Sequence, residues 1–184
     1  LMYALIWTTT PWTLPANLGL AVKPDTHYVL VEDGQDRYWL ARERVDAVFR
    51  DEKPEVLATQ KGAKLVGRRY EPPFDTYRRF ADRTFRVVAG DFVSTEEGTG
   101  IVHIAPAFGE DDFEVGRREG WPVAMPVDAE GRFTDEVPEY AGKFVKEADP
   151  LIIRRLRDEG KLVHHTTVQH PYPFCYRCDA PLLY

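Results

Sequence analysis

Apolar residues occur along this chain in short runs separated by turn-forming residues, which is typical of a β-rich protein. Strands are expected at 3–10, 18–22, 27–31, 37–41, 64–67, 84–89, 91–95, 101–104 and 161–169. An Asp33-Gly34 turn signal should join the third and fourth of these strands as a hairpin. Turn signals about 8 to 12 residues apart predict a mainly β fold, with a closed β-barrel core and peripheral α-helices and hairpins.

Helical periodicity is confined to three segments of the chain. The first covers residues 43–50, and the second opens after Gly109 and closes at Gly120. In the third, Asp149-Pro150 has the pattern of an N-cap followed by a first helical residue, and Gly160 ends the helix. These helices are too few to form a core alone, so they are expected to pack outside the barrel.

The most distinctive polar stretch is Trp7-Thr8-Thr9-Thr10-Pro11-Trp12-Thr13-Leu14-Pro15-Ala16-Asn17. Its prolines and β-branched threonines disfavour a helix, so an extended segment is expected, with Thr8 and Thr10 on one face and Thr9 on the other. Hydroxyl groups both donate and accept hydrogen bonds, which suits them to hold a water molecule or the polar end of a ligand. A threonine-rich edge strand followed by a proline turn would explain the same residues without any ligand.

A second segment, Gly98 to Phe113, combines a glycine turn, a buried strand and an acidic helix start. The strand at 101–104 carries His103, and a histidine on an apolar strand is more often a satisfied core residue than a functional one. Asp111 and Asp112 stand in the first turn of the helix, where a carboxylate can cap the chain. If one of these carboxylates caps the helix, the other is free to face a pocket.

Together the two segments resemble the editing insertion of class I aminoacyl-tRNA synthetases, specifically that of the isoleucyl enzyme. Valyl and leucyl relatives carry a Thr-Arg-Pro-type first motif in place of the Thr-Thr-Pro of this chain. The resemblance implies a barrel of the type found in valyl, isoleucyl and leucyl editing domains. It also implies that residues 1–184 are one editing domain excised from a larger, bacterial synthetase. Fourteen prolines and a single asparagine fit a thermophilic source.

The resemblance implies hydrolysis of the aminoacyl ester of valine mischarged to tRNA(Ile), with valyl-adenylate as a further substrate. One methylene is worth only about 1 to 3 kcal/mol in a binding pocket, so an isoleucine site needs a second site to remove valine. The implied partners are the 3′ end of the tRNA and the remainder of the synthetase, with no DNA and no membrane. Editing should need no cofactor, and the location should be the cytoplasm.

The resemblance also implies roles for particular residues. The catalytic residues would be Thr8, Thr9, Thr10 and Asp112. The substrate-binding residues would be Trp7, Trp12, Thr13, His103 and Asp111. Asp112, with Asp111 as second choice, would bind the α-ammonium group of the ester, while the threonines orient water and the ribose or carbonyl. His103 would form a wall of the side-chain pocket, and no Ser-His-Asp arrangement is present in the sequence.

Cys175-Tyr176-Arg177-Cys178 has the C-x-x-C spacing of a zinc knuckle. A zinc site needs four ligands, and the chain has no second cysteine pair, although His164, His165 and His170 lie nearby. The resemblance implies that Cys175 and Cys178 form half a site within the segment 171–184, so that Zn²⁺ would bind only with ligands outside this chain. A disulfide between these cysteines is disfavoured in the cytosol.

Charge and composition narrow the remaining functions. A net charge of -6 argues against broad electrostatic binding of nucleic acid, so RNA contacts would have to be local. The candidate basic groups, each also explained as a solvated surface, are Arg68-Arg69, Arg78-Arg79, Arg117-Arg118 and Arg154-Arg155 with Arg157.

No apolar run approaches the roughly 20 residues of a membrane span. No glycine-rich phosphate loop precedes a helix, so ATP binding would belong to the parent enzyme. A zinc-stabilised, non-catalytic RNA-binding module is the alternative.

Overall fold

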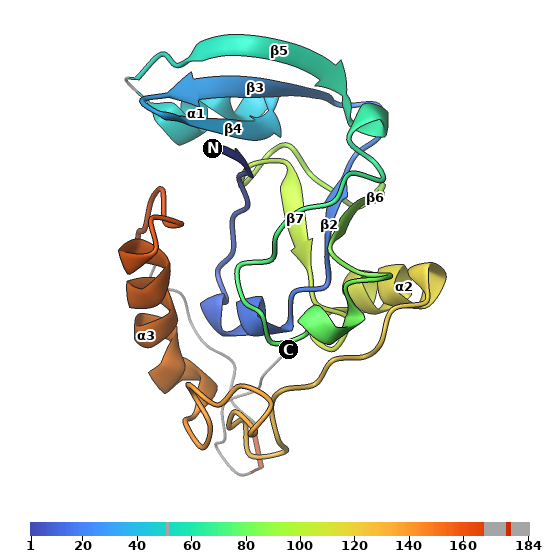
Figure 1. Cartoon of the computed structure of the whole chain (residues 1–184), viewed down its shortest axis with the longest axis vertical. Coiled ribbons are helices and arrows are strands. Elements are labelled where there is room, and N and C mark those ends of the chain that lie inside the picture. Colours follow the sequence, from blue (N-terminus) through green and yellow to red (C-terminus); the bar gives the residue numbers. More distant parts are fainter. Residues whose placement is uncertain (51, 168–175, 178–184) are drawn as a thin grey trace. The chain divides into compact units, whose positions relative to one another are not determined.

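The computed structural model describes residues 1–50, 52–167 and 176–177 (Figure 1). The chain divides into two compact units, Leu1–Ala124 and Met125–Tyr184. The strands of the described residues lie in the first unit, in two mixed sheets, and this unit contains both sequence motifs. None of the helices in the described ranges is long and apolar enough to cross a membrane.

The first sheet has the strand order β1-β4-β3-β5. Its strands are β1 (Met2–Ala4), β3 (His27–Asp33), β4 (Asp36–Ala41) and β5 (Glu55–Lys61), and the short helix α1 (Val45–Phe49) follows β4. The hairpin predicted at Asp33-Gly34 is confirmed, because β3 and β4 pair antiparallel on either side of it. The sequence did not predict β5, whose residues are almost all exposed and therefore show no apolar alternation. The strand predicted at 64–67 is wrong, because Lys64 ends the 3₁₀ helix Gly62–Lys64 and residues 65–67 form a turn.

The second sheet has the order β6-β2-β7 and carries the candidate site. Its central strand β2 (Gly19–Val22) runs parallel to β6 (Arg86–Ala89) and antiparallel to β7 (Ile101–Ile104). All four residues of β2 are buried, as expected for a central strand. The strand predicted at 91–95 is wrong, since this segment forms a turn.

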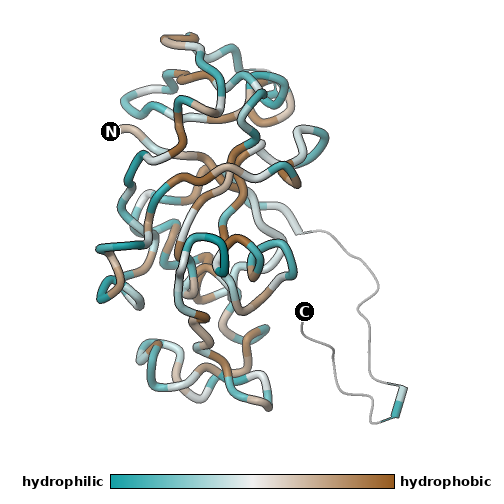
Figure 2. The backbone as a smooth tube through the Cα atoms, turned by 90° about the vertical axis from the view of Figure 1, so that its right-hand side faces the viewer, coloured by the Kyte–Doolittle hydropathy of each residue, from teal (hydrophilic) through white to brown (hydrophobic). Residues whose placement is uncertain are grey.

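Strand pairing in the described residues gives two open sheets rather than one closed hydrogen-bonded ring. The sheets are joined by Tyr28, whose hydroxyl donates to the Gly100 carbonyl oxygen at 2.7 Å and accepts from the Lys23 amide at 2.9 Å. Apolar residues from both sheets, including Leu20 and Trp39, pack in one cluster. Figure 2 shows hydrophobic segments crossing the middle of the first unit. The architecture of the described residues is thus two mixed sheets with some helices.

The helix α2 (Glu110–Glu119) follows β7 and confirms the second predicted helix. It ends at Gly120, whose φ of 68° is rarely adopted by residues other than glycine. Gly109 is its N-cap and supplies no side-chain hydrogen bond, so neither Asp111 nor Asp112 occupies the N-cap position.

The first motif is not the extended strand that its prolines and threonines predicted. The strand β1 ends at Ala4, before the motif begins, and Pro11–Ala16 forms a 3₁₀ helix. The φ that proline imposes is compatible with a 3₁₀ turn, and Pro11 stands at the helix start, where its missing N–H costs nothing. The amide of Thr13 donates to the Thr10 carbonyl oxygen at 3.0 Å, which closes the first turn.

In the second unit, α3 (Val145–Asp158) starts earlier than Asp149-Pro150 predicted. The amide of Phe144 donates to Glu147 Oε2 at 3.3 Å, so the glutamate satisfies a backbone donor at the real N-terminus and Pro150 lies inside the helix. The predicted end at Gly160 is confirmed. The strand predicted from residue 161 is absent from 161–167, and residues 168 and 169 lie outside the described residues.

Candidate functional site

The two sequence motifs meet at His103 on β7. Its Nε2 lies 2.9 Å from Thr13 Oγ1, and its Nδ1 lies 3.2 Å from Asn17 Nδ2. The pairing of β2 with β7 places His103 opposite Leu20. Because the first motif runs directly into β2, this register brings Thr13 and Asn17 to the histidine across about 90 residues of sequence. The predicted association of the two segments is therefore present in the structure.

The hydroxyl groups of the first motif are arranged in a turn that precedes the 3₁₀ helix. The Thr8 and Thr10 hydroxyl oxygens lie 3.3 Å apart, and the Thr10 amide donates to Thr8 Oγ1 at 3.0 Å. Thr8 and Thr10 are half-buried, whereas Thr9 is exposed. This confirms that Thr8 and Thr10 face one way and Thr9 another, although a side-chain turn rather than strand alternation produces the arrangement.

Asp112 is the acidic residue that faces inward. It is partly buried, its Oδ1 accepts a hydrogen bond from the Ala105 amide at 2.7 Å, and Asp111 is exposed. Burial raises the pKa of the Asp112 carboxyl, and the Ala105 amide opposes that rise. The carboxylate lies so close to Gly109 that a Cβ on that glycine would stand 2.6 Å from Asp112 Oδ2. Asp112 is thus a desolvated acid that a cationic ligand would stabilise in its charged form.

A continuous series of contacts connects Asp112 with the threonines. Asp112 binds the backbone of Ala105, two residues beyond His103, and His103 contacts Thr13. The Thr13 hydroxyl also lies 2.9 Å from the Thr10 carbonyl oxygen, to which it donates. The structure therefore brings Asp112, His103, Thr13 and the Thr8–Thr10 turn to one end of β7.

The two tryptophans of the first motif have different environments. Trp7 is 52% exposed and lies beside Gly98, where an added Cβ would stand 3.1 Å from its ring. Trp12 is 1% exposed and packs edge-to-face against Phe108, with ring centroids 4.8 Å apart. Trp12 therefore supports the site from the core, while Trp7 is accessible from solvent.

Burial lowers the pKa of His103 to about 4, so its imidazole is neutral near pH 7. Both ring nitrogens are engaged, one by Thr13 and the other by Asn17. An imidazole held in this way is poorly placed to take a proton from water. It is better suited to form a wall than to act as a general base.

Sequence reasoning assigned no role to Asn17 and Tyr70, which the structure places at the site. Asn17 is 4% exposed, and its side chain donates to the Gly19 carbonyl oxygen at 3.0 Å. The Tyr70 hydroxyl donates to Asn17 Oδ1 at 2.6 Å. Asn17 could have been found as the only asparagine of the chain, standing inside the first motif. Tyr70 carries no local signal, because only the fold brings its loop to the site.

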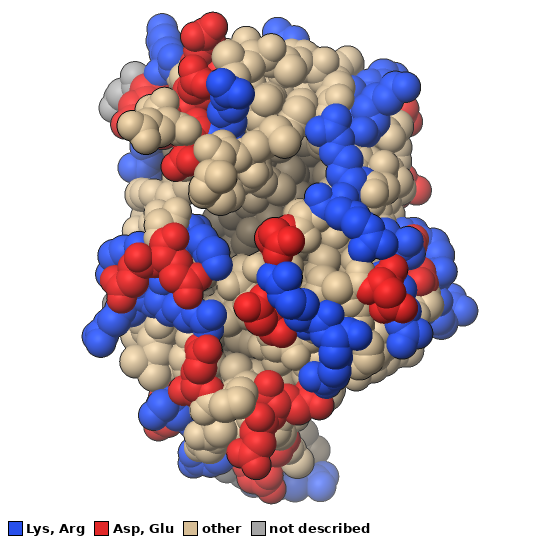
Figure 3. All heavy atoms as spheres, viewed as in Figure 1, with Lys and Arg blue, Asp and Glu red and all other residues tan. Residues whose placement is uncertain are grey.

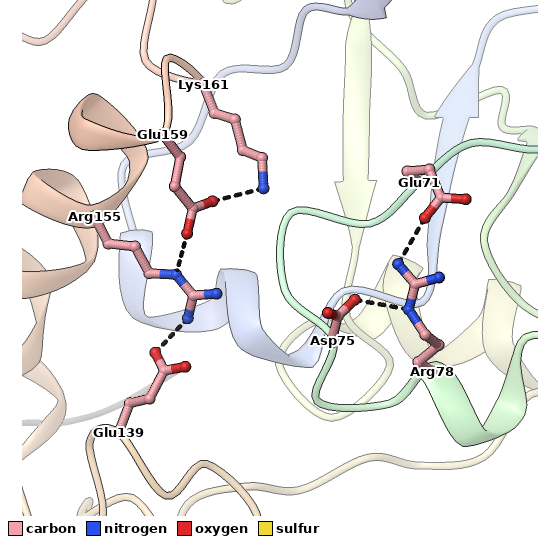
Figure 4. A network of polar contacts seen from close by, with 7 residues as sticks. All are labelled: Glu71, Asp75, Arg78, Glu139, Arg155, Glu159 and Lys161. Carbon is pink, nitrogen blue, oxygen red and sulfur yellow. Dashed lines mark hydrogen bonds and ion pairs between the residues drawn. The ribbon is translucent and has the colours of Figure 1, made fainter.

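The described residues test neither the metal prediction nor the RNA prediction. Cys175 and Cys178 lie outside those residues, and the described residues contain no group of three or more histidine, cysteine or acidic side chains able to hold a metal ion. Several candidate arginines are already paired, such as Arg78 with Glu71 and Asp75, and Arg155 with Glu139 and Glu159 (Figure 4). Figure 3 shows acidic residues next to basic ones in several places, together with one run of mostly basic residues on its right-hand side. Local RNA contacts at these arginines therefore stay a prediction.

Comparison with known proteins gives matches in sequence and in structure. No protein-family profile matches the chain. Isoleucine-tRNA ligase of Mycobacterium leprae is 49% identical over 192 residues, and that of Bdellovibrio bacteriovorus is 50% identical over 185 residues. These alignments cover 99% and 98% of the chain, which spans 18% of the length of each relative.

Two solved structures show the same fold. GlLeuRS-CP1 matches with a TM-score of 0.69 and 13% identity, over 91% of this chain and 85% of that one. The editing domain of the P. knowlesi cytosolic leucyl-tRNA synthetase matches with a TM-score of 0.65 and 12% identity, over 87% of this chain and 82% of that one. By sequence the chain belongs with the bacterial isoleucine-tRNA ligases, of which it represents one segment, and that segment has the fold of a CP1 editing domain.

Proposed function

We propose that this chain is the editing domain of an isoleucine-tRNA ligase and hydrolyses the ester of valine attached to tRNA(Ile). The observation that supports this most directly is the meeting of the two motifs at one end of β7. There a partly buried carboxylate, a hydroxyl cluster and a neutral histidine lie together. An aminoacyl ester offers an ammonium group, a carbonyl with its ribose, and a side chain. Each feature of the ester thus has a matching group in the protein.

In this proposal Asp112 binds the α-ammonium group of the ester. Its Oδ1 is held by the Ala105 amide, and the absence of a side chain at Gly109 leaves room for the carboxylate. Because burial raises the pKa of Asp112, an ammonium group beside it would stabilise the charged form and gain binding energy from the same desolvation. The carboxylate would therefore fix the amino acid by the group that all aminoacyl esters share.

The Thr8–Thr10 turn would position the water and the terminal ribose. The two hydroxyl groups 3.3 Å apart can accept from a water molecule and donate to the ribose or carbonyl oxygen. Water attacks the ester carbonyl, the bond to the ribose oxygen breaks, and that oxygen takes up a proton, which releases valine and tRNA. The reaction would rely on positioning rather than on a protein base, because neither a threonine hydroxyl nor His103 is suited to take the proton.

His103 and Thr13 would form the wall that separates valine from isoleucine. The imidazole is fixed at both nitrogens and therefore cannot move aside cheaply for an extra methylene. A wall of this kind would exclude isoleucine by overlap rather than by binding energy, which is the principle of a second, smaller sieve. Valyl-adenylate, which carries the same ammonium group and side chain, would be a further substrate.

The proposal includes the 3′ end of tRNA(Ile) and the remainder of the synthetase as partners, and a location in the cytoplasm. It also keeps the barrel closure of related editing domains as an expectation, together with a zinc site that Cys175 and Cys178 would share with ligands elsewhere in the synthetase. Editing itself would use no cofactor.

The test is the rate at which valyl-tRNA(Ile) loses its ester in the presence of the chain, compared with spontaneous loss. Asp112→Asn is the matched variant, because it keeps the shape of the side chain and removes the charge. The proposal expects rapid ester loss with the native chain and slow loss with the variant. Binding of the tRNA without ester loss would instead favour the zinc-stabilised RNA-binding module.

A further inference from the structure

We infer that Tyr70 is a positioning residue for this site, which acts through the Asn17 amide to hold His103 in the tautomer that carries its proton on Nε2. The effect on ester selectivity rests on the proposed function, whereas the tautomer of His103 does not. The inference follows from the donors and acceptors in one series of hydrogen bonds.

The orientation of the Asn17 amide is fixed by Gly19. The backbone carbonyl oxygen of Gly19 can only accept, so the Asn17 atom 3.0 Å away from it must be the nitrogen Nδ2. The other terminal atom is then Oδ1, and the Tyr70 hydroxyl at 2.6 Å donates to it. Reversing the amide would set the carbonyl oxygens of Asn17 and Gly19 against each other, and it would break the hydrogen bond that Tyr70 donates to Asn17 Oδ1.

The tautomer of His103 follows from that orientation. The second proton of Asn17 Nδ2 points to His103 Nδ1 at 3.2 Å, so Nδ1 must accept and carries no proton. A neutral imidazole then carries its proton on Nε2, which donates to Thr13 Oγ1 at 2.9 Å. The Thr13 hydroxyl gives its own proton to the Thr10 carbonyl oxygen at 2.9 Å. Every donor in the series points from Tyr70 toward Thr10, and hydrogen bonds in such a chain strengthen one another.

Tyr70 is well held for this role. Its amide donates to the Phe85 carbonyl oxygen at 3.1 Å, and the two rings pack edge-to-face with centroids 6.2 Å apart. Burial raises the pKa of the Tyr70 hydroxyl, so it remains a donor at any physiological pH. Without this hydroxyl, Asn17 Oδ1 would lose its donor, and Gly19 alone would hold the amide. The amide would then hold His103 Nδ1 less firmly, and the tautomer with the proton on Nδ1 would gain population.

The consequence for the site concerns the surface that His103 presents. With Nδ1 and Nε2 both engaged, only carbon atoms of the ring remain to face a ligand. Such a wall rejects a longer side chain without offering it a hydrogen bond. If the ring exchanges tautomers and tilts, it no longer blocks the longer side chain, and the site accepts the isoleucyl ester.

The test uses Tyr70→Phe, which keeps the ring and its contact with Phe85 and removes only the hydroxyl. Long-range ¹H–¹⁵N spectra of the labelled chain report which nitrogen of His103 carries the proton. We expect the Nε2–H form alone in the native chain and a mixture of both tautomers in the variant. The preference for valyl-tRNA(Ile) over isoleucyl-tRNA(Ile) should fall about tenfold, which corresponds to about 1.4 kcal/mol.

Tyr28→Phe is the matched control, because it also removes one tyrosine hydroxyl from the interior of the chain. The Tyr28 hydroxyl donates to the backbone carbonyl oxygen of Gly100 at 2.7 Å, away from His103. This substitution should lower stability while leaving both the tautomer and the ester preference unchanged. Should Tyr70→Phe fail to fold, Asn17→Asp provides the second variant. It replaces the donor facing His103 Nδ1 by an acceptor and should move the proton to Nδ1.

An unchanged Nε2–H form of His103 in Tyr70→Phe, or in Asn17→Asp when only that variant folds, would overturn the inference. Equal changes in ester preference for Tyr70→Phe and Tyr28→Phe would also overturn it, since Tyr70 would then act only through stability. If the native chain cleaves neither ester, the proposed function fails, and the tautomer measurement still decides the role of Tyr70.

Discussion

The neutral state of His103 should make the stability of this chain depend on pH in a defined window. Burial lowers the pKa of His103 to about 4, whereas an unfolded histidine titrates at 6.5. As pH falls from 6.5 to 4, His103 binds a proton in the unfolded chain but not in the folded chain. The free energy of unfolding should then decrease by about 1.4 kcal/mol for each pH unit, or about 3 kcal/mol in total. The stabilisation that comes from the neutral state of His103 is fully present above pH 6.5.

The perturbation that isolates this effect is His103→Gln, whose amide nitrogen can replace Nε2 as the donor to Thr13. Urea unfolding of both proteins at several pH values between about 4 and 7.5 gives the difference in stability. Burial raises the pKa of Asp112, which acts with the opposite sign, because a folded state that binds a proton more tightly gains stability as pH falls. Subtracting the variant from the native chain at each pH removes this term.

The difference curve should be flat above pH 6.5 and slope downward below it. His27→Gln, which changes an exposed histidine outside the site, is the matched control and should follow the native chain. A difference curve that stays flat down to pH 4.5 would refute the reasoning. It would mean that His103 takes up its proton as easily in the folded as in the unfolded chain.

Three further substitutions test other parts of the structure. Asp112→Asn should slow hydrolysis of valyl-tRNA(Ile) by about 10- to 150-fold, which corresponds to the free energy of one hydrogen bond to a charged group. If the variant changes only in stability, Asp112 serves only to hold α2 against Ala105. Gly109→Ala should slow hydrolysis similarly, because the new methyl group, 2.6 Å from Asp112 Oδ2, turns the carboxylate away; an unaffected rate would count against that position of the carboxylate. Gly19→Ala should lower the free energy of unfolding by about 1 to 3 kcal/mol, because its Cβ would stand 2.0 Å from the Trp121 ring, and unchanged urea unfolding would contradict this contact.

The sequence by itself determined the local elements whose signals are strong. The hairpin at Asp33-Gly34 and the end of α2 at Gly120 follow from turn chemistry, and both are as expected. The two motifs were sufficient to point to an editing insertion, because their residue types are unusual together. Sequence reasoning was weaker where a pattern had two structural solutions. The prolines of the first motif excluded a regular helix, yet they fit a 3₁₀ helix as well as a strand.

Tertiary structure decided which groups face each other. The family resemblance ranked Asp112 before Asp111, but the residue types alone gave no reason for that order, because it depends on the direction of α2 relative to Ala105. It gave no reason to pair Tyr70 with Asn17, since the two are 53 residues apart and meet only when the loop packs on Phe85. Spacing along a chain records the periodicity of helices and strands, whereas the partners of a buried polar group are set by the packing of distant segments. The residue types in the sequence therefore indicated the chemistry of the site, whereas the fold determined how those residues are arranged.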